Sequence, residues 1–349
     1  MEKRIWGLDA VRALAVVLVL SIHGITLSNL VANTFGTALW FPVLLLRQTA
    51  LACVPLFILL TGYLNKNKRP CKKYYLSVIP TVVTYLIISA LSQGAKITIG
   101  EGSGVIKNIL HVFDFTANGY AWYMEMYFGL FIMLPFINIF YNTLGTLKNR
   151  ITVTAVLVAV TMLPSAFSSI GVTNLRLDIL PDYWEAMYPI TYYFIGMLLA
   201  DIKPEIKKVK NIAVLIGWIV IMAAVCFGLS ALSGQYAWWF ANGFGCIYNA
   251  VTAVLIFMLL YNINCRNDIF KNAVSFVSSC ALEIYLLSYI TDKALYTYLR
   301  LPMPVMTALT FLCSLALAVL LKRAASPLGV LITDKTEKFL ITIENKFNE

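Results

Sequence analysis

The segment from Asp9 to Asn29 reads DAVRALAVVLVLSIHGITLSN and contains one long apolar run. A run of about 20 residues is long enough to cross the hydrocarbon core of a bilayer as a single helix. Comparable runs recur along the chain, so that 60% of its 349 residues are apolar and only 13% are charged. Soluble domains carry about 25% charged residues. The composition therefore excludes an ordinary soluble domain and predicts an all-α, polytopic transmembrane helical bundle.

Ten spans are predicted along the chain, and the basic residues orient them. If the N-terminus is cytoplasmic, twenty Lys and Arg residues fall on the inner side of the membrane and five on the outer side. Since cytoplasmic loops carry the excess of Lys and Arg, both termini are predicted to lie inside. The net charge of +10 then reflects membrane topology, and no nucleic-acid partner is predicted. The spans lie at about 9–29, 40–64, 74–93, 121–142, 150–170, 184–201, 211–232, 245–262, 273–292 and 304–323.

The chain is predicted to form one integral-membrane domain over residues 1–325, followed by a cytoplasmic amphipathic tail over residues 326–349. Apolar residues at helical spacing among Lys and Glu in this tail are typical of a helix on the inner leaflet. The stretch Val105–Phe113 is also amphipathic and predicts a re-entrant or interfacial cover on the outer side. The seven cysteines are scattered without ligand spacing, so no metal site is predicted.

Ionisable residues inside apolar runs cost free energy in lipid and are the first candidates for a function. The first span holds three of them, Asp9, Arg12 and His23. The eleven residues from Arg12 to His23 make three helical turns plus about 20°, so both side chains leave one face of the helix, about 16 Å apart along its axis. Asp9 lies one turn before Arg12 on that face and is predicted to support the guanidinium.

These three residues also have a purely structural interpretation. Asp9 and Arg12 can be a juxtamembrane ion pair whose arginine snorkels to the inner headgroups, and His23 can be a polar residue satisfied by a neighbouring helix. A neutral imidazole in this position can, however, act as a general base at physiological pH. The shared face with Arg12 favours a catalytic role for His23.

A second set of candidates lies in the fourth span, within the sequence GYAWYMEMY at residues 119–127. Trp122 and Tyr123 either belong to the interfacial aromatic belt or offer a stacking surface for a sugar. Glu125 lies about one turn into the membrane from the outer side, and its candidate partners are Arg47 and a sugar hydroxyl. Glu283 in the ninth span is either a structural partner for another helix or a further acceptor contact. Arg47 is assigned a supporting structural role.

A basic run follows the second span on the predicted inner side. Membrane topology explains most of such a run. Alternatively, the run receives the phosphates of a nucleotide-bearing donor, because Arg binds phosphate through a bidentate fork and Lys binds it as a point charge. The candidate donor-binding residues are Lys68, Arg69, Lys72 and Lys73.

Four stretches, in the same order along the chain, resemble the membrane acyltransferase-3 family. The sequence LDAVRALA at 8–15, with the spacing from Arg12 to His23, resembles its first helix, and VPLFILLTGY at 54–63 resembles the end of its second. AWY at 121–123, leading to Pro135 and Phe136, resembles its Trp-Tyr/Phe helix. YYFIG at 192–196 resembles its later Phe-x-Gly helix. The resemblance spans residue 7 to about residue 320.

The resemblance implies an O-acyltransferase in a bacterial plasma membrane. Its donor would be cytoplasmic acyl-CoA, with acetyl-CoA expected first, and its acceptor a hydroxyl of an extracytoplasmic polysaccharide or a lipid-linked sugar. No bound cofactor is implied, and the lipid bilayer, acyl-CoA and the glycan are the expected partners. His23 matches the family's essential histidine, and Arg12 matches the arginine associated with the donor, so both are predicted to be catalytic. The sequence does not fix the oligomeric state.

The chain departs from the family pattern at three places. The Arg-x-x-Arg pattern entering the third helix is present only in a degenerate form within residues 68–73, so the donor contacts are assigned loosely. Ala121 and Ser288 stand where family members often carry a histidine.

A transporter or flippase for a sugar or a lipid-linked saccharide is the competing hypothesis. Arg12, Arg47, Glu125 and Glu283 would then line a substrate path, and His23 would relay protons. Such a protein would need no acyl-CoA.

Overall fold

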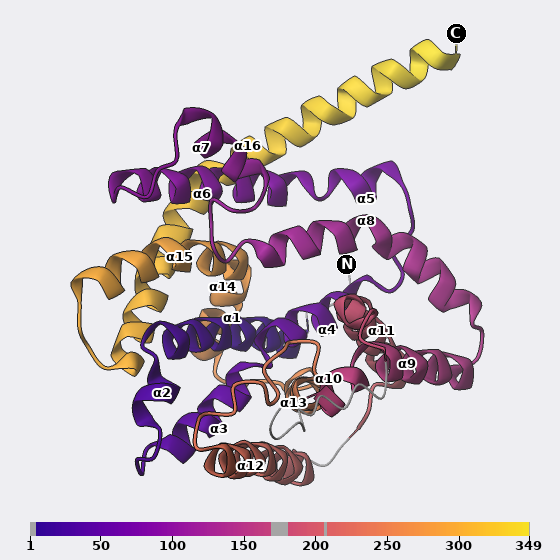
Figure 1. The fold of residues 1–349 in the computed structure, drawn as a ribbon. Coiled ribbons are helices and arrows are strands. Elements are labelled where there is room, and N and C mark those ends of the chain that lie inside the picture. Colours follow the sequence, from indigo (N-terminus) through magenta and orange to yellow (C-terminus); the bar gives the residue numbers. More distant parts are fainter. Residues whose placement is uncertain (1–4, 169–180, 206–207, 349) are drawn as a thin grey trace. The chain divides into compact units, whose positions relative to one another are not determined.

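The computed structural model describes residues 5–168, 181–205 and 208–348, and no β-strand occurs within these ranges (Figure 1). The predicted all-α fold is therefore confirmed. The helices are α1 (Trp6–Leu27), α2 (Leu30–Thr34), α3 (Trp40–Ala50), α4 (Cys53–Asn65), α5 (Lys72–Leu76), α6 (Ile79–Thr98), α7 (Val105–Phe113), α8 (Trp122–Thr143), α9 (Leu147–Thr161), α10 (Leu163–Ser168), η1 (Glu185–Met187), α11 (Tyr188–Ile202), α12 (Lys208–Ser233), α13 (Ile247–Leu260), α14 (Asp268–Ser279), α15 (Ala281–Tyr298) and α16 (Met303–Asn348).

Each of the ten predicted spans falls on a helix or on a pair of consecutive helices. By length and apolar composition, six segments of the described chain can cross a membrane, and the pair α14 and α15 adds a seventh if it is one broken span. The chain is thus a multi-pass membrane protein, and the count of ten stays a prediction. Parts of the topology argument lie outside the described residues, namely positions 169–170 of the fifth span and the charges Lys3, Arg4, Arg176 and Lys207.

Helix α16 crosses the boundary that the sequence suggests at residue 326. A proline inside a helix removes a hydrogen bond and usually marks a kink or an end. Nevertheless, α16 is assigned as one helix, and Pro327 lies in its interior. The division between domain and tail is therefore not marked by a helix end, and the placement of the tail on the inner leaflet stays a prediction.

The chain separates into two compact units, and each is described by itself. The first unit comprises Met1–Lys66, Tyr141–Ser279 and Leu301–Thr307. The second unit comprises Asn67–Phe140, Cys280–Arg300 and Ala308–Glu349.

In the first unit, α4 and α11 cross with their backbones in direct contact. A Cβ on Gly62 would lie 2.2 Å from the carbonyl oxygen of Tyr193, and a Cβ on Gly196 would lie 2.2 Å from the carbonyl oxygen of Leu59. Both distances are far below van der Waals contact, so only glycine fits at either position. The two glycines belong to the TGY and YYFIG stretches of the sequence. This crossing explains in physical terms why both stretches contain glycine.

Helix α3 packs against both α1 and α12 in the first unit (Figure 1). The interface is a hydrophobic cluster that includes Ile25 of α1, Leu44 of α3 and Ala223 of α12. The chain after α12 adds Phe240 to the same cluster. Burial of these apolar side chains stabilises the arrangement and fixes the rotation of α3 about its axis.

In the second unit, α6 packs against α15 and also contacts α7. Helix α7 coincides with the amphipathic stretch predicted from the sequence, and Val105 and Ile106 at its start are 76% and 75% exposed. Tyr85 of α6 donates a hydrogen bond to the carbonyl oxygen of Val112 at 2.8 Å and ties the two helices together. The role of α7 as an outer cover stays a prediction.

Candidate active site

The N-terminal part of α1 carries a hydrogen-bonded polar group built from α1 and α14. Asp9 is buried, and its two carboxylate oxygens accept from Ser278 Oγ at 2.9 Å and from Ser275 Oγ at 3.2 Å. Arg12 Nη1 donates to Ser278 Oγ at 3.4 Å. Ser278 therefore links the carboxylate to the guanidinium, and Asp9 supports Arg12 at least in part through a hydroxyl of another helix.

Local packing explains why α14 supplies these hydroxyls. Helix α14 packs along α1, and Trp6 at the start of α1 donates from Nε1 to the carbonyl oxygen of Lys271 at 3.2 Å. Ser275 and Ser278 are three residues apart, so they share one face of α14. Sequence reasoning missed both serines, although a pair of hydroxyls at helical spacing in an apolar stretch was the available signal.

His23 lies on the second half of α1, four residues before the helix ends at Leu27, and it is partly exposed. Its neighbours Ile22 and Ile25 pack in the hydrophobic cluster that also contains Trp40 and Phe240. The histidine is thus carried by a helix whose flanking residues are held in a packed core. A catalytic side chain needs such a rigid support to keep its geometry.

The predicted donor-binding run lies in the second unit. Lys68, Arg69 and Lys73 are exposed, and Lys72 is partly buried at the start of α5. The run is anchored to α8, because Asn138 Nδ2 donates to the carbonyl oxygen of Lys68 at 2.8 Å. Its exposed cations are available to a polyanion. Arg12 belongs to the first unit, so a donor site shared by Arg12 and this run stays a prediction.

Tyr74, which directly follows the basic run, fixes the run in place. Its ring stacks on the ring of Phe131 with 4.4 Å between centroids, and its hydroxyl donates to the carbonyl oxygen of Phe131 at 2.7 Å. The backbone of the basic run is therefore held in place next to Tyr74, whereas most of the basic side chains are exposed.

The predicted acceptor-binding residues also lie in the second unit. Trp122 is 37% exposed, and the ring of Tyr123 packs edge-on against Tyr285 of α15 with 5.9 Å between centroids. Glu125 is exposed on α8, so this carboxylate is not desolvated by protein. Glu283 is buried on α15, where Lys322 of α16 is a charged neighbour. Trp122 and Glu125 are exposed and Tyr123 is partly exposed, and both the aromatic belt and a sugar contact require such exposure.

A family model described as an acyltransferase domain, that of acyltransferase-3, matches residues 5–323 of the chain. The chain belongs to this family. It is therefore a membrane acyltransferase, and every predicted site residue lies within the matched range. Comparison with curated proteins and with solved structures gives no match. Among the residues that the structure describes, no group of three or more His, Cys, Asp or Glu side chains could hold a metal ion.

The acyltransferase has a buried carboxylate that sequence reasoning missed. Asp292 of α15 accepts from Tyr120 Oη at 2.8 Å and from Thr310 Oγ1 at 2.7 Å, and it is almost fully buried. Asp292 lies at the last position of the predicted ninth span. A charged residue at the end of a span is common, so its position gave no sign of a buried role. Both carboxylate oxygens accept a hydroxyl, which is typical of a structural link between helices.

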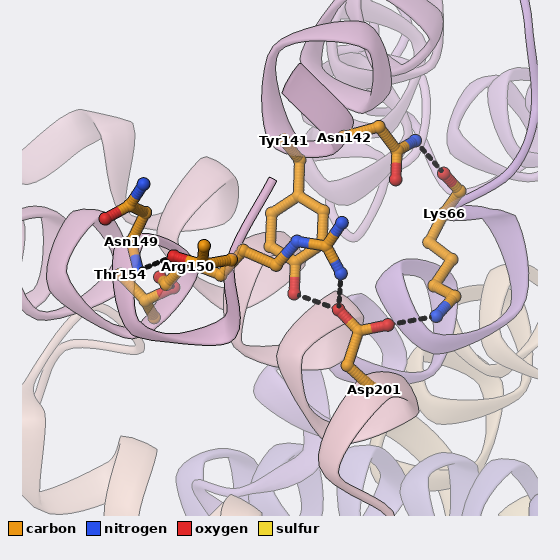
Figure 2. Close-up of polar contacts among 8 residues, drawn as sticks. Lys66, Tyr141, Asn142, Asn149, Arg150, Thr154 and Asp201 are labelled. Carbon is orange, nitrogen blue, oxygen red and sulfur yellow. Dashed lines mark hydrogen bonds and ion pairs between the residues drawn. The ribbon is translucent and has the colours of Figure 1, made fainter. Parts of the chain in front are cut away.

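Figure 2 shows a second missed group, in which Asp201 at the end of α11 binds three side chains; we call it the Asp201 cluster. Asp201 pairs with Lys66 through Oδ1, and its Oδ2 accepts from Arg150 Nη1 at 2.8 Å and from Tyr141 Oη at 2.6 Å. The guanidinium of Arg150 also lies 4.9 Å from the centre of the Tyr141 ring. The cluster joins the ends of α4, α8 and α11 to the start of α9 in the acyltransferase.

A third group surrounds Arg47 of α3. The arginine is 6% exposed, its Nη2 donates to Asn242 Oδ1, and its guanidinium carbon lies 5.6 Å from the ring centre of Tyr236. Its polar contacts therefore come from the segment that follows α12. Glu125, the partner considered from the sequence, belongs to the second unit, so that pairing is not supported by a described contact. We call Arg47, Tyr236, Asn242 and the buried chain neighbour of Arg47, Gln48, the Arg47 cluster.

Proposed function

We propose that this acyltransferase moves an acyl group, an acetyl group in the first instance, from cytoplasmic acyl-CoA to a hydroxyl of an extracytoplasmic polysaccharide or lipid-linked sugar. The proposal places the protein in a bacterial plasma membrane. The observation that carries it is the family match over residues 5–323. The presence of Arg12 and His23 on one face of α1, about 16 Å apart along the axis, supports it.

The donor is held at the predicted inner end of α1 in this proposal. Arg12 and the exposed cations Lys68, Arg69, Lys72 and Lys73 bind the phosphates of the CoA moiety, since several positive charges are needed to neutralise them. Ser278 and Asp9 position Arg12. The extended arm of CoA then carries the thioester toward His23.

The chemistry follows from the properties of a neutral imidazole. The acceptor oxygen attacks the thioester carbonyl carbon while His23 takes the proton of the hydroxyl. The C–S bond breaks as the ester C–O bond forms, and the proton passes from the imidazolium to the CoA thiolate. In the alternative route, an imidazole nitrogen of His23 attacks the thioester carbonyl carbon, the C–S bond breaks, and CoA leaves as the thiol after taking up the imidazole proton. The acceptor oxygen then attacks the acyl-imidazole, the N–C bond breaks, and the proton of the hydroxyl returns to the imidazole.

The acceptor is proposed to contact residues of the second unit. Trp122 and Tyr123 stack on a sugar ring, and Glu125 accepts hydrogen bonds from its hydroxyls. The exposure of Trp122 and Glu125 supports these roles, because an incoming glycan must be able to reach them. Glu283 is proposed as a further acceptor contact. Because Glu283 is buried on α15, the sugar would have to enter the interior of the second unit to touch it.

The test is an incubation of the purified protein with labelled acetyl-CoA and candidate envelope glycans. The expected product is a labelled glycan ester that mild alkali removes. Transport of a sugar into sealed vesicles, without any labelled ester, would instead support the transporter hypothesis and contradict the proposal.

A further inference from the structure

The Arg47 cluster is a buried polar site inside the hydrophobic core of the first unit. Trp40, Leu44, Arg47 and Gln48 form one stripe along α3, and each of them is at most 6% exposed. Trp40 and Leu44 pack in the hydrophobic cluster, so the same face of the helix carries a cation and an amide into an apolar environment. Burial of a charge or an amide in such surroundings is costly unless both are paired.

Among the residues that the structure describes, the partners of this cation are neutral. Arg47 binds the amide oxygen of Asn242 and the face of the Tyr236 ring. Within the described residues, three buried polar atoms of the cluster make no hydrogen bond: Arg47 Nη1, Gln48 Nε2 and Tyr236 Oη. Two of these atoms are donors only, and the third can donate, so the cluster lacks an acceptor and a negative charge.

Tyr236 is in a state to donate. Burial raises the pKa of its phenol to about 12, against the opposing effect of the nearby Arg47 charge. The hydroxyl therefore keeps its proton at physiological pH. An anion in the cluster would receive a hydrogen bond from the phenol in addition to those from Arg47.

Asn242, which accepts the hydrogen bond of Arg47, is exposed, so the cluster lies close to the surface of the first unit although Arg47 itself is buried. The location also fits a substrate. Arg47 lies on α3, which packs against α1, and the His23 neighbours Ile22 and Ile25 pack in the same hydrophobic cluster as Trp40 and Leu44.

We propose that the Arg47 cluster binds a carboxylate, and hence that the acyltransferase takes an acidic sugar as its acceptor. One guanidinium matches the single negative charge of a carboxylate, and a planar acceptor with two oxygens matches the fork of Arg47 together with the Tyr236 hydroxyl. A phosphate dianion would need a second cation. The assignment of an acidic sugar as the acceptor rests on the proposed acyl transfer. The binding of a carboxylate by the Arg47 cluster does not depend on that function.

The binding test uses the purified full-length protein in detergent. Methyl β-glucuronide, methyl β-glucoside and inorganic phosphate are titrated separately, and the midpoint of thermal unfolding is followed. The glucuronide is expected to raise the midpoint saturably, because a ligand that binds only the folded state stabilises it. The glucoside, which carries a neutral hydroxymethyl group in place of the carboxylate, is expected to leave the midpoint unchanged. Equal effects of glucuronide and glucoside, or of glucuronide and phosphate, would overturn the proposal.

Two variants locate the effect. Arg47→Gln should abolish the response to glucuronide, and Tyr236→Phe, which keeps the ring that packs on Arg47, should weaken the affinity roughly tenfold. Arg266→Gln, the loss of an exposed positive charge in the same unit, is the matched control and should respond like the wild type. If Arg47→Gln folds poorly, Tyr236→Phe still decides the question. A wild-type response of the Tyr236→Phe protein would contradict the assignment.

An acylation assay separates this inference from the proposed function. The wild type is expected to acetylate an acidic glycan in preference to its neutral analogue, and Tyr236→Phe should reduce that preference. Glucuronide binding without any acyl transfer would contradict the proposed function but would still support the carboxylate site. Acyl transfer that is equally fast to both glycans would overturn the inference and leave the proposed function intact.

Discussion

The Asp201 cluster and the Arg47 cluster lie in the same unit, and the cations in the two clusters have different partners: a carboxylate for the partly buried Lys66 and Arg150, and neutral groups for the buried Arg47. In the first, one carboxylate binds Lys66, Arg150 and Tyr141, so the positive charges are countered inside the protein. In the second, Arg47 has a neutral amide and an aromatic ring as its partners, and its Nη1 bonds to none of the described residues.

The difference teaches which polar groups hold the fold and which are available to a ligand. A cation paired with a carboxylate at a helix end links the elements that supply the two charges, and its removal exposes the remaining charge to an apolar environment. A buried cation without a carboxylate gains little stability from its own chain and is suited to an incoming anion. The two clusters should therefore respond differently to substitution.

The largest effect on stability is expected for Gly196→Val. Helices α4 and α11 meet at Gly196, and the same two helices are linked by the pair of Lys66 and Asp201. A valine side chain would overlap the Leu59 carbonyl, force the helices apart and lower the free energy of unfolding by more than about 3 kcal/mol. Thermal unfolding in detergent measures this loss. Gly217→Val, on an open part of α12, is the control, and equal midpoints for the two variants would show that the crossing is not tight.

Asp201→Ala should have the next largest effect. It removes the carboxylate that Lys66 and Arg150 share, and the loss is expected to be about 2–3 kcal/mol because the pair is mostly but not fully buried. The shift of the unfolding midpoint relative to the exposed control Asp182→Ala gives the value. A midpoint as high as that of the control would mean that the cluster does not stabilise the fold.

A smaller effect is expected for Tyr141→Phe. This variant removes one hydrogen bond to a charged acceptor and keeps the ring beside Arg150, so the expected loss is about 1.5 kcal/mol. The exposed Tyr183→Phe serves as the reference in the same unfolding measurement. A loss as large as that of Asp201→Ala would indicate that the hydroxyl, and not the pair of charges, dominates the cluster.

Arg47→Gln should change the stability least. The variant removes a buried charge that faces no carboxylate of the described chain and keeps an amide that can bind Asn242, so the unfolding free energy should stay within about 1 kcal/mol of the wild type. Unfolding without added ligand measures this. A loss comparable to that of Asp201→Ala would show that Arg47 stabilises the fold. The two clusters would then both be structural, and the comparison would fail.

The sequence predicts the fold class and the positions of ten apolar segments that fall on helices, because apolar runs of membrane length are a strong signal. It also predicts the face shared by Arg12 and His23, since helix periodicity alone determines which side chains lie together. These inferences depend on residues close to one another along the chain.

Most of the missed contacts join residues far apart in the sequence. Ser278 lies 266 residues from Arg12, and Asp201 lies 135 residues from Lys66. A hydroxyl in an apolar stretch and a carboxylate at a helix end are both common, so neither signals a partner on another helix. The role of Gly62 and Gly196 likewise becomes clear only when the backbones of α4 and α11 are seen to touch.

The central claim is that His23 performs acyl transfer, and acetylation by the His23→Ala protein tests it most directly. Label from acetyl-CoA should no longer reach the glycan, while the amount of folded protein in the membrane stays at the wild-type level. His111→Ala, the loss of the other histidine of the chain, is the matched control and should retain the activity. Undiminished transfer by His23→Ala would contradict the account.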